Sequence, residues 1–258
     1  MEIGSEKWNI IIRQGAKTVG IDVSDEQLKL FAAHARELIN WNRKINLTAI
    51  TDPFEIAVKH IVDSLAPAVM IFPHDSMLDI GSGGGFPGIP LKILMPTLSV
   101  TLIDASRKKV SFLNHVLRTL KLDNMDVHQI RGEDIILEHP EIPRFQKTQL
   151  EFRRPSFNPI KSVLAKPFDI VISRALASLN DFITMALPAL KKDGLIVAMK
   201  GKVSEPEIES VRLALSRDSI ASTTGSDNFS VTRKTYKLPF IAAERSLISI
   251  RRMGRSTS

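Results

Sequence analysis

The sequence predicts an α/β fold, in which helices cover a seven-stranded and mostly parallel sheet and an N-terminal helical cap packs against it. From Met77 onward, short apolar runs alternate with segments whose apolar residues recur at helical spacing, and this alternation is typical of parallel sheets. Before about residue 74, only the helical spacing occurs. A glycine-rich turn also follows the first apolar run directly.

The N-terminal segment begins its regular pattern at Ser24, which forms a capping-box sequence with Gln27. Behind it, apolar residues recur on one helical face, at Leu28, Phe31, Ala35, Leu38, Ile39 and Ile45. Pro53 restarts the chain, and a helix or helix pair is expected through His60 and Asp63. We therefore expect a cap over residues 1–74 and a main domain over residues 75–258.

The main domain has an expected order of strands and helices. The strands are expected at residues 77–80, 100–104, about 126–131, 168–173, 194–200, about 229–238 and 246–251, the last two as an antiparallel pair. Helices are expected over residues 88–95 and from Ser106, Ser178 and Ser204, because each serine stands in the N-cap position before a helical pattern. Residues 135–166, which hold four prolines and Arg153-Arg154, interrupt this rhythm and are interpreted as a surface insertion. It is either a loop without a role or a segment that contacts RNA.

Composition limits the class of protein. Apolar residues make up 43% and charged residues 24% of the 258 residues, which suits one large globular domain with an appendage. No apolar run is long enough to cross a membrane, and the absence of cysteine excludes disulfides and thiolate metal sites. We expect a cytoplasmic protein without a metal, with a monomer as the default. The net charge of +7 suggests a polyanionic partner, although a merely basic protein is the alternative.

The glycine turn has the pattern Asp79-x-Gly81-x-Gly83-x-Gly85. A dinucleotide-binding turn requires a glycine at the position that Phe86 holds here, so a nicotinamide dehydrogenase is the least favoured interpretation. The observed spacing is typical of enzymes that bind S-adenosylmethionine (SAM). Because clustered glycines weaken regular structure, a ligand site explains them better than a tight turn alone.

Charged residues follow the other strands. Asp104 ends the second strand, where a carboxylate accepts hydrogen bonds from a ribose or caps the next helix. Gly132-Glu133 follow the third strand, Arg174 ends the fourth, and Lys200 ends the fifth. Since ligands bind at the carboxyl ends of parallel strands, all of them are candidates for one site. For Arg174 we expect a carboxylate partner, either that of the cofactor or Glu133.

Several segments resemble the bacterial ribosomal RNA small subunit methyltransferase G family, also called glucose-inhibited division protein B. They are Trp41-Asn42-x-x-x-Asn46-Leu47-Thr48, Lys59-His60-x-x-Asp63-Ser64-Leu65, the run from Asp79 to Pro90, Arg107-Lys108-Lys109-x-x-Phe112-Leu113, Arg131-Gly132-Glu133, Ser173-Arg174-Ala175 and Lys200-Gly201. They span residues 41–201 in the family's order. The insertion at 135–166 departs from the family's pattern, in which a shorter segment connects these strands.

The resemblance implies a Rossmann-like class I SAM-dependent methyltransferase fold and methyl transfer from SAM to N7 of a guanine in small-subunit (16S) ribosomal RNA. It also implies cofactor contacts at Gly81, Phe86, Gly132, Glu133 and Arg174. Gly83 and Gly85 belong to the same turn, and Asp104 fits the ribose position of methyltransferases in general.

The residue types agree with that chemistry. Methylation of a pyrimidine carbon usually uses a cysteine, which the chain lacks, and Ser173-Arg174-Ala175-Leu176 stands where adenine amino methylation favours an Asn/Asp-Pro-Pro-aromatic motif. Guanine N7 already has a free lone pair, so no general base is required and we name no catalytic residue.

The ribosomal RNA, alone or in the small subunit, must reach the same rim. The candidate contacts are Arg43, Lys44, His60, Arg107, Lys108 and Lys200. A solvated helix face is the alternative for Arg107 and Lys108, and a packing role is the alternative for His60. Two other functions remain open, a small-molecule methyltransferase and a non-catalytic RNA- or ribosome-binding assembly factor on the same fold.

Overall fold

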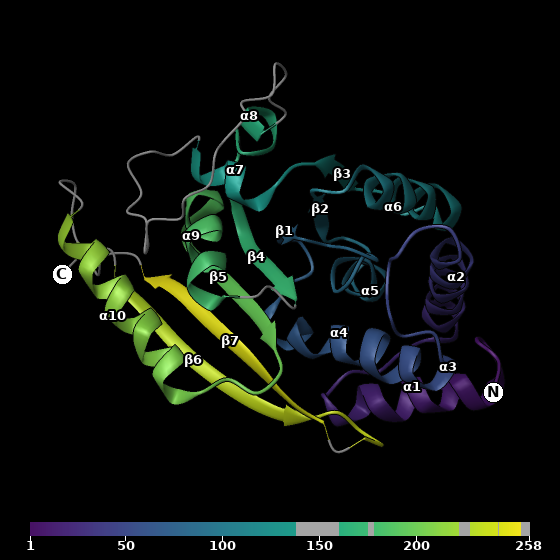
Figure 1. Cartoon of the computed structure of the whole chain (residues 1–258). Coiled ribbons are helices and arrows are strands. Elements are labelled where there is room, and N and C mark those ends of the chain that lie inside the picture. Colours follow the sequence, from purple (N-terminus) through teal and green to yellow (C-terminus); the bar gives the residue numbers. More distant parts are fainter. Residues whose placement is uncertain (138–159, 175–177, 222–227, 242, 254–258) are drawn as a thin grey trace.

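A computed structural model describes residues 1–137, 160–174, 178–221, 228–241 and 243–253 (Figure 1). Its centre is a seven-stranded sheet in the order β3-β2-β1-β4-β5-β7-β6. The strands are β1 (Ser76–Ile80), β2 (Ser99–Asp104), β3 (Met125–Gln129), β4 (Phe168–Arg174), β5 (Leu190–Lys200), β6 (Asn228–Lys237) and β7 (Glu244–Met253). The first five are parallel, and β7 runs antiparallel to both β5 and β6.

Helices cover both faces of the sheet, because the buried strand residues alternate between two apolar clusters. Met77 and Ile172 belong to one cluster, together with α5 (Gly88–Leu94), α6 (Arg107–Leu120) and the N-terminal helices. Leu78 and Val171 belong to the other, together with α7 (Gly132–Leu137), α9 (Leu179–Ala186) and α10 (Glu205–Ala221). The chain reverses its strand order between β1 and β4, and at such a point open α/β sheets bind ligands.

The cap consists of α1 (Glu6–Thr18), α2 (Asp25–Asn42) and a helical run over residues 53–70. Ser24 and Gln27 form the expected capping box at the start of α2. Trp8 and Phe31 are completely buried in the cluster that also contains Met77 and Leu102 of the sheet. The cap and the first face of the sheet thus share one core (Figure 1). The division of the chain at residue 74 stays a prediction.

The helical run over residues 53–70 contains a feature that the sequence did not predict. Between α3 (Pro53–Glu55) and α4 (Asp63–Leu65), residues Ile56–Val62 form a π-helix, and a 3₁₀ helix (Ala66–Met70) ends the run. The amide of Asp63 donates to the carbonyl of Val58, five residues earlier. A π-helix is rare and often occurs at functional sites.

All seven expected strands are confirmed, and so is the antiparallel pair at the end of the chain. Ser106 and Ser178 accept hydrogen bonds in the first turns of α6 and α9. The predicted insertion begins inside α7 and ends just beyond α8 (Ile160–Val163), while its centre lies outside the described residues. Within the described ranges, no helix is long and apolar enough to cross a membrane.

Candidate cofactor site and its helical clamp

The glycine turn leads from β1 to α5 at the switch point of the sheet. Gly81, Gly83 and Gly85 all have positive φ angles, of 74°, 57° and 86°. This backbone conformation strongly favours glycine, which explains the alternate spacing in the sequence. A Cβ atom on Gly83 would meet nothing closer than the Gly81 carbonyl oxygen, at 3.9 Å. By contrast, a Cβ on Gly85 would collide with Ile89.

Asp104 holds this turn from the end of β2. Its Oδ2 accepts a hydrogen bond from the Gly83 amide at 3.0 Å, and its Oδ1 accepts one from the Ser106 amide at 2.8 Å. Ser106 itself caps α6, so the capping alternative for Asp104 is taken by Ser106, and the ribose role of Asp104 stays a prediction. Lys109 Nζ lies 3.9 Å from the Oδ2 of Asp104.

Asp79 lies beneath the turn and is fully buried. Its Oδ2 accepts a hydrogen bond from the Gly88 amide at 2.9 Å, whereas its Oδ1 has no hydrogen-bond partner in the described part of the chain. Burial raises the pKa of Asp79 to about 7, although the Gly88 amide and Arg174 oppose this shift. The open space at Gly83 and the Asp104 carboxylate beside it fit a nucleoside.

Phe86 closes the turn with an aromatic stack. Its ring lies 4.5 Å from the ring of His60 and 4.7 Å from that of His34, and only 4% of the residue is exposed. The Nε2 of His34 lies 2.8 Å from the Gly84 carbonyl oxygen, to which it donates. Burial lowers the pKa of His34 to about 4, so the ring is neutral. Helix α2 thereby fixes the middle of the turn.

Arg174, at the end of β4, contacts the same aromatic ring, with its Cζ 5.0 Å from the ring centre. Its Nη1 donates to the Lys59 carbonyl oxygen at 3.0 Å, and its Nη2 donates to the His60 Nδ1 at 3.1 Å. His60 is therefore neutral, and its Nε2–H donates to the Thr48 hydroxyl at 2.9 Å. Burial and then the charge of Arg174 lower the pKa of His60 to about 3.

The carboxylate that faces Arg174 is Asp63, so the expectation of Glu133 as its partner within the chain is wrong for the described residues. Asp63 Oδ2 lies 3.7 Å from Arg174 Nη1 and 3.6 Å from Arg245 Nε. Asp63 Oδ1 accepts a hydrogen bond from the Tyr236 hydroxyl at 2.7 Å. Asp63 is only 4% exposed. We call Asp63, Arg174, Tyr236 and Arg245 the Asp63 cluster.

Gly132 and Glu133 begin α7 beside the turn. A Cβ atom on Gly132 would lie 3.1 Å from Ile80 at the end of β1 and would also collide with Met185. Gly132 therefore allows α7 to approach the glycine turn closely. The Glu133 side chain is exposed at this rim.

Four of the predicted RNA-contacting residues are exposed at helix ends. Arg43 and Lys44 follow α2, and Arg107 and Lys108 lie in the first turn of α6. The last turns of α2 pack against the middle of α6. Trp41 contacts Phe112, with ring centres 5.7 Å apart, and Glu37 accepts a hydrogen bond from His115 at 2.8 Å.

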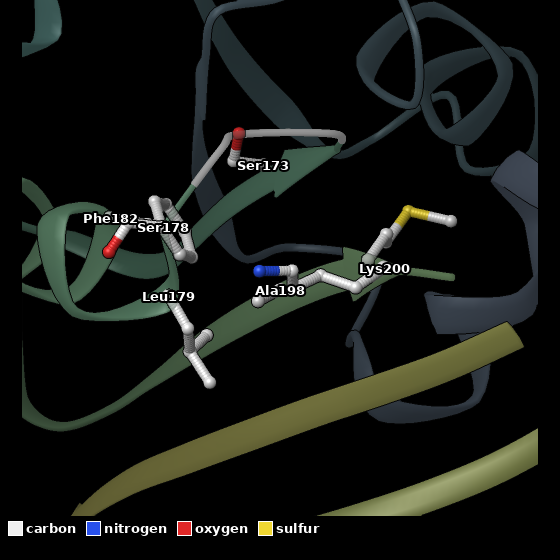
Figure 2. A pocket seen from close by; sticks show the side chains of 7 residues that line it. Ser173, Ser178, Leu179, Phe182, Ala198 and Lys200 are labelled. Carbon is white, nitrogen blue, oxygen red and sulfur yellow. The ribbon is translucent and has the colours of Figure 1, made fainter. Parts of the chain in front are cut away.

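The other two predicted RNA contacts are engaged within the protein. His60 is 6% exposed and stacked against Phe86, as its packing alternative predicts. Lys200 donates to Glu207 at 2.7 Å and is largely buried. Lys200 lines a small pocket with Ser173, Ser178, Leu179, Phe182, Ala198 and Met199 (Figure 2). This pocket lies where β4 and β5 end and α9 begins.

Sequence reasoning assigned no individual role to His34, Asp63, Tyr236 or Arg245. His34 interrupts the apolar face of α2, and Asp63 follows His60 by three residues on a helix, so a polar residue on an apolar face was the available signal. Tyr236 is the only tyrosine of the chain, but its contact with Asp63 joins residues distant in sequence. Among the described residues, no group of three or more potential ligands for a metal was found.

The strand order, the glycine turn after β1 and the carboxylate after β2 define a class I SAM-dependent methyltransferase fold. A solved structure of PH0793 from Pyrococcus horikoshii, described as a transferase, is similar with a TM-score of 0.50 and 13% identity over 75% of this chain and 63% of that chain. At this identity the likeness concerns the fold alone.

The family follows from the sequence comparisons. Residues 27–147 and 158–228 match the model of the family "rRNA small subunit methyltransferase G". Proteins named ribosomal RNA small subunit methyltransferase G are 38% identical in Geobacter sulfurreducens, over 93% of this chain and 95% of the relative, and 38% identical in Geobacter metallireducens, over 97% and 99%. The chain belongs to this family. Residues 148–157, inside the predicted insertion, are not matched.

Proposed function

We propose that this protein transfers a methyl group from SAM to N7 of a guanine in small-subunit (16S) ribosomal RNA. The observation that carries the proposal is the open glycine turn at the switch point of the sheet, held by Asp104, in a member of the rRNA small subunit methyltransferase G family. The finer assignments, which are N7 and the residues of the site, rest on the chemistry of the side chains and on the resemblance described above.

The residues of the rim have distinct proposed roles toward the cofactor. Gly81, Gly83 and Gly85 bring the backbone close to the nucleoside, and Asp104 accepts hydrogen bonds from the ribose. Gly132 and Glu133 bind the adenine, and the Glu133 carboxylate accepts a hydrogen bond from the adenine amino group. Arg174 binds the carboxylate of the methionine part. Phe86 contributes through its backbone, since its ring is packed between His34 and His60.

The bound cofactor supplies an electrophilic methyl group on a positively charged sulfur. Guanine N7 offers its lone pair without losing a proton, so the protein need not supply a base. The task of this chain is then to orient the guanine and to exclude competing geometries. Arg43, Lys44, Arg107 and Lys108 bind phosphates around the rim, and the target base leaves its stack if it is paired.

The test is incubation of the purified protein with methyl-labelled SAM and small ribosomal subunits that lack the modification. We expect label in 7-methylguanine after digestion of the RNA. Subunits that already carry the modification are the matched control and should take up no label. Label on another atom would refute the N7 assignment alone. Binding of unmethylated subunits without any transfer would instead indicate a non-catalytic assembly factor.

A further inference from the structure

The Asp63 cluster joins three parts of the chain that are distant in sequence. Asp63 comes from α4, Arg174 from the end of β4, and Tyr236 and Arg245 from β6 and β7. Both carboxylate oxygens are used, Oδ1 by the Tyr236 hydroxyl and Oδ2 by the two guanidinium groups. The cluster therefore connects the cap, the rim of the sheet and the C-terminal hairpin.

Without Asp63, the two arginines of this cluster would have no carboxylate between them. Arg174 and Arg245 both approach the same oxygen atom, so without the carboxylate two cations would face each other in a largely buried place. Burial lowers the pKa of Arg174, the charge of Asp63 opposes that effect, and the charge of Arg245 adds to it. Asp63 is the group that makes it favourable to hold the Arg174 guanidinium here.

The position of Arg174 is also defined by what surrounds it. Lys59 and His60 of the π-helix accept hydrogen bonds from two of its nitrogens, and the ring centre of Phe86 in the glycine turn lies 5.0 Å from its Cζ. On the side of the turn, Asp79 is the second carboxylate that attracts Arg174. An arginine released from Asp63 would be drawn toward Asp79 or toward solvent, and in either case away from its present place.

We propose that Asp63 is a positioning residue that holds Arg174 over the cofactor turn by compensating the charges of Arg174 and Arg245. Asp63 itself does not touch the cofactor. This role rests on the proposed function, since it matters only if Arg174 binds SAM. It goes beyond that function because it makes the C-terminal hairpin, through Tyr236 and Arg245, part of the cofactor site.

The main test compares Asp63→Asn, Arg245→Gln and the double variant by calorimetric titration with SAM. Asparagine keeps the size of the side chain and can still accept from Tyr236, but it removes the charge. We expect Asp63→Asn to weaken SAM binding about tenfold or more and Arg245→Gln to weaken it less than about threefold. The double variant should bind SAM more tightly than Asp63→Asn, because the uncompensated second cation is then gone.

A merely structural role predicts the opposite sign of coupling, since two structural losses would add up or worsen each other. Additive losses, or wild-type affinity in Asp63→Asn, would therefore overturn the positioning role. If Asp63→Asn does not fold, Tyr236→Phe decides the question. It leaves the carboxylate in place but frees Oδ1 to rotate, and a loss of SAM affinity of about threefold or more is expected. Unchanged affinity in that variant would overturn the role.

Steady-state kinetics separate the effect on the cofactor from a general loss of activity. In Asp63→Asn, the KM for SAM should rise while the KM for the ribosomal subunit stays unchanged. Asp169→Asn is the matched control, because Asp169 also pairs with a cation, Lys191, but at the opposite end of β4. It should leave the SAM affinity unaltered. A wild-type protein that does not bind SAM would refute the proposed function together with this role, whereas equal binding by wild type and variants would refute the role alone.

Discussion

At the scale of single residues, the glycines of the turn divide into two kinds. Gly83 and Gly85 both have positive φ angles, but only at Gly85 does the protein itself fill the space where a side chain would begin. The space next to Gly83 is open to a ligand. Of these two glycines, Gly85 is therefore needed for folding and Gly83 is needed for ligand binding.

Exchange of each glycine for alanine should separate these roles. Gly83→Ala should fold, with a loss of stability of about 1–2 kcal/mol from its left-handed backbone, and should lose SAM binding because the Cβ occupies the open space. Gly85→Ala should be much less stable, since its Cβ collides with Ile89. Thermal unfolding and calorimetric titration with SAM measure the two effects. Normal SAM affinity in Gly83→Ala would contradict the placement of the cofactor.

Asp79 predicts a pH dependence of stability. Its pKa is about 7 in the folded protein and 3.8 in the reference state without burial. Between these values the folded state holds a proton that the unfolded state has lost, so the free energy of unfolding should fall as the pH rises from 4 to 7. The contribution is on the order of 3–4 kcal/mol. Urea unfolding of Asp79→Asn should show a correspondingly flatter profile, and identical slopes in the two proteins would exclude Asp79 as the cause.

At the scale of elements, the π-helix Ile56–Val62 connects the cap to the rim. It presents the Lys59 carbonyl and the His60 ring to Arg174 and directs Asp63 toward the same guanidinium. Helix α1 packs against this π-helix. The indole nitrogen of Trp8, in α1, donates to the Pro53 carbonyl oxygen at 2.9 Å, three residues before the π-helix begins.

Loss of this support should be measurable in the stability of the whole protein. Trp8→Ala removes a fully buried ring and should lower the free energy of unfolding by about 3–5 kcal/mol. Trp8→Phe keeps an aromatic ring and loses the hydrogen bond, so a smaller loss of about 1–3 kcal/mol is expected. Chemical denaturation measures both variants. Equal losses would show that the hydrogen bond, and not the packing, accounts for the contribution of Trp8.

The regular elements were predictable because their signals are local. Ser24 and Ser106 mark helix starts by their own side chains, and the apolar alternation marks the strands. The π-helix was not predictable, because its residues also fit an α-helical pattern and its contacts with α1 and β4 join residues that are distant in sequence. The partner of Arg174 was missed for a similar reason, since the sequence shows which strands end in charged residues but not which face of the sheet each charge takes.

At the scale of the whole molecule, two exposed pairs of cations belong to helices that pack on each other. Arg43 and Lys44 follow α2, Arg107 and Lys108 begin α6, and the last turns of α2 contact α6 through Trp41 and Glu37. The cap thus contributes to the proposed RNA-binding rim as well as to the core.

This arrangement predicts how RNA binding responds to charge and salt. Reversal of Arg43 and Lys44 to glutamate should weaken binding of small-subunit RNA and reduce the slope of log K against log salt by about 2, because two phosphate contacts are lost. SAM affinity should not change. Arg118→Glu is the control, since Arg118 is exposed in the last turn of α6, at the other end of that helix. Arg118→Glu reverses one charge where the double variant reverses two, so an effect on filter binding half as large would show that only the net charge matters.

The π-helix has one more consequence, which concerns insertions and deletions. An α-helix turns by about 100° per residue, whereas a π-helix holds more residues in each turn. The seven residues Ile56–Val62 therefore turn about as far as six α-helical residues would. Removal of one residue here would let the segment close as an α-helix and leave Asp63 directed roughly toward Arg174. Insertion of one more residue into an α-helical continuation would instead swing Asp63 by about 100° relative to Pro53. Deletion of one codon here should therefore be tolerated better than insertion of one.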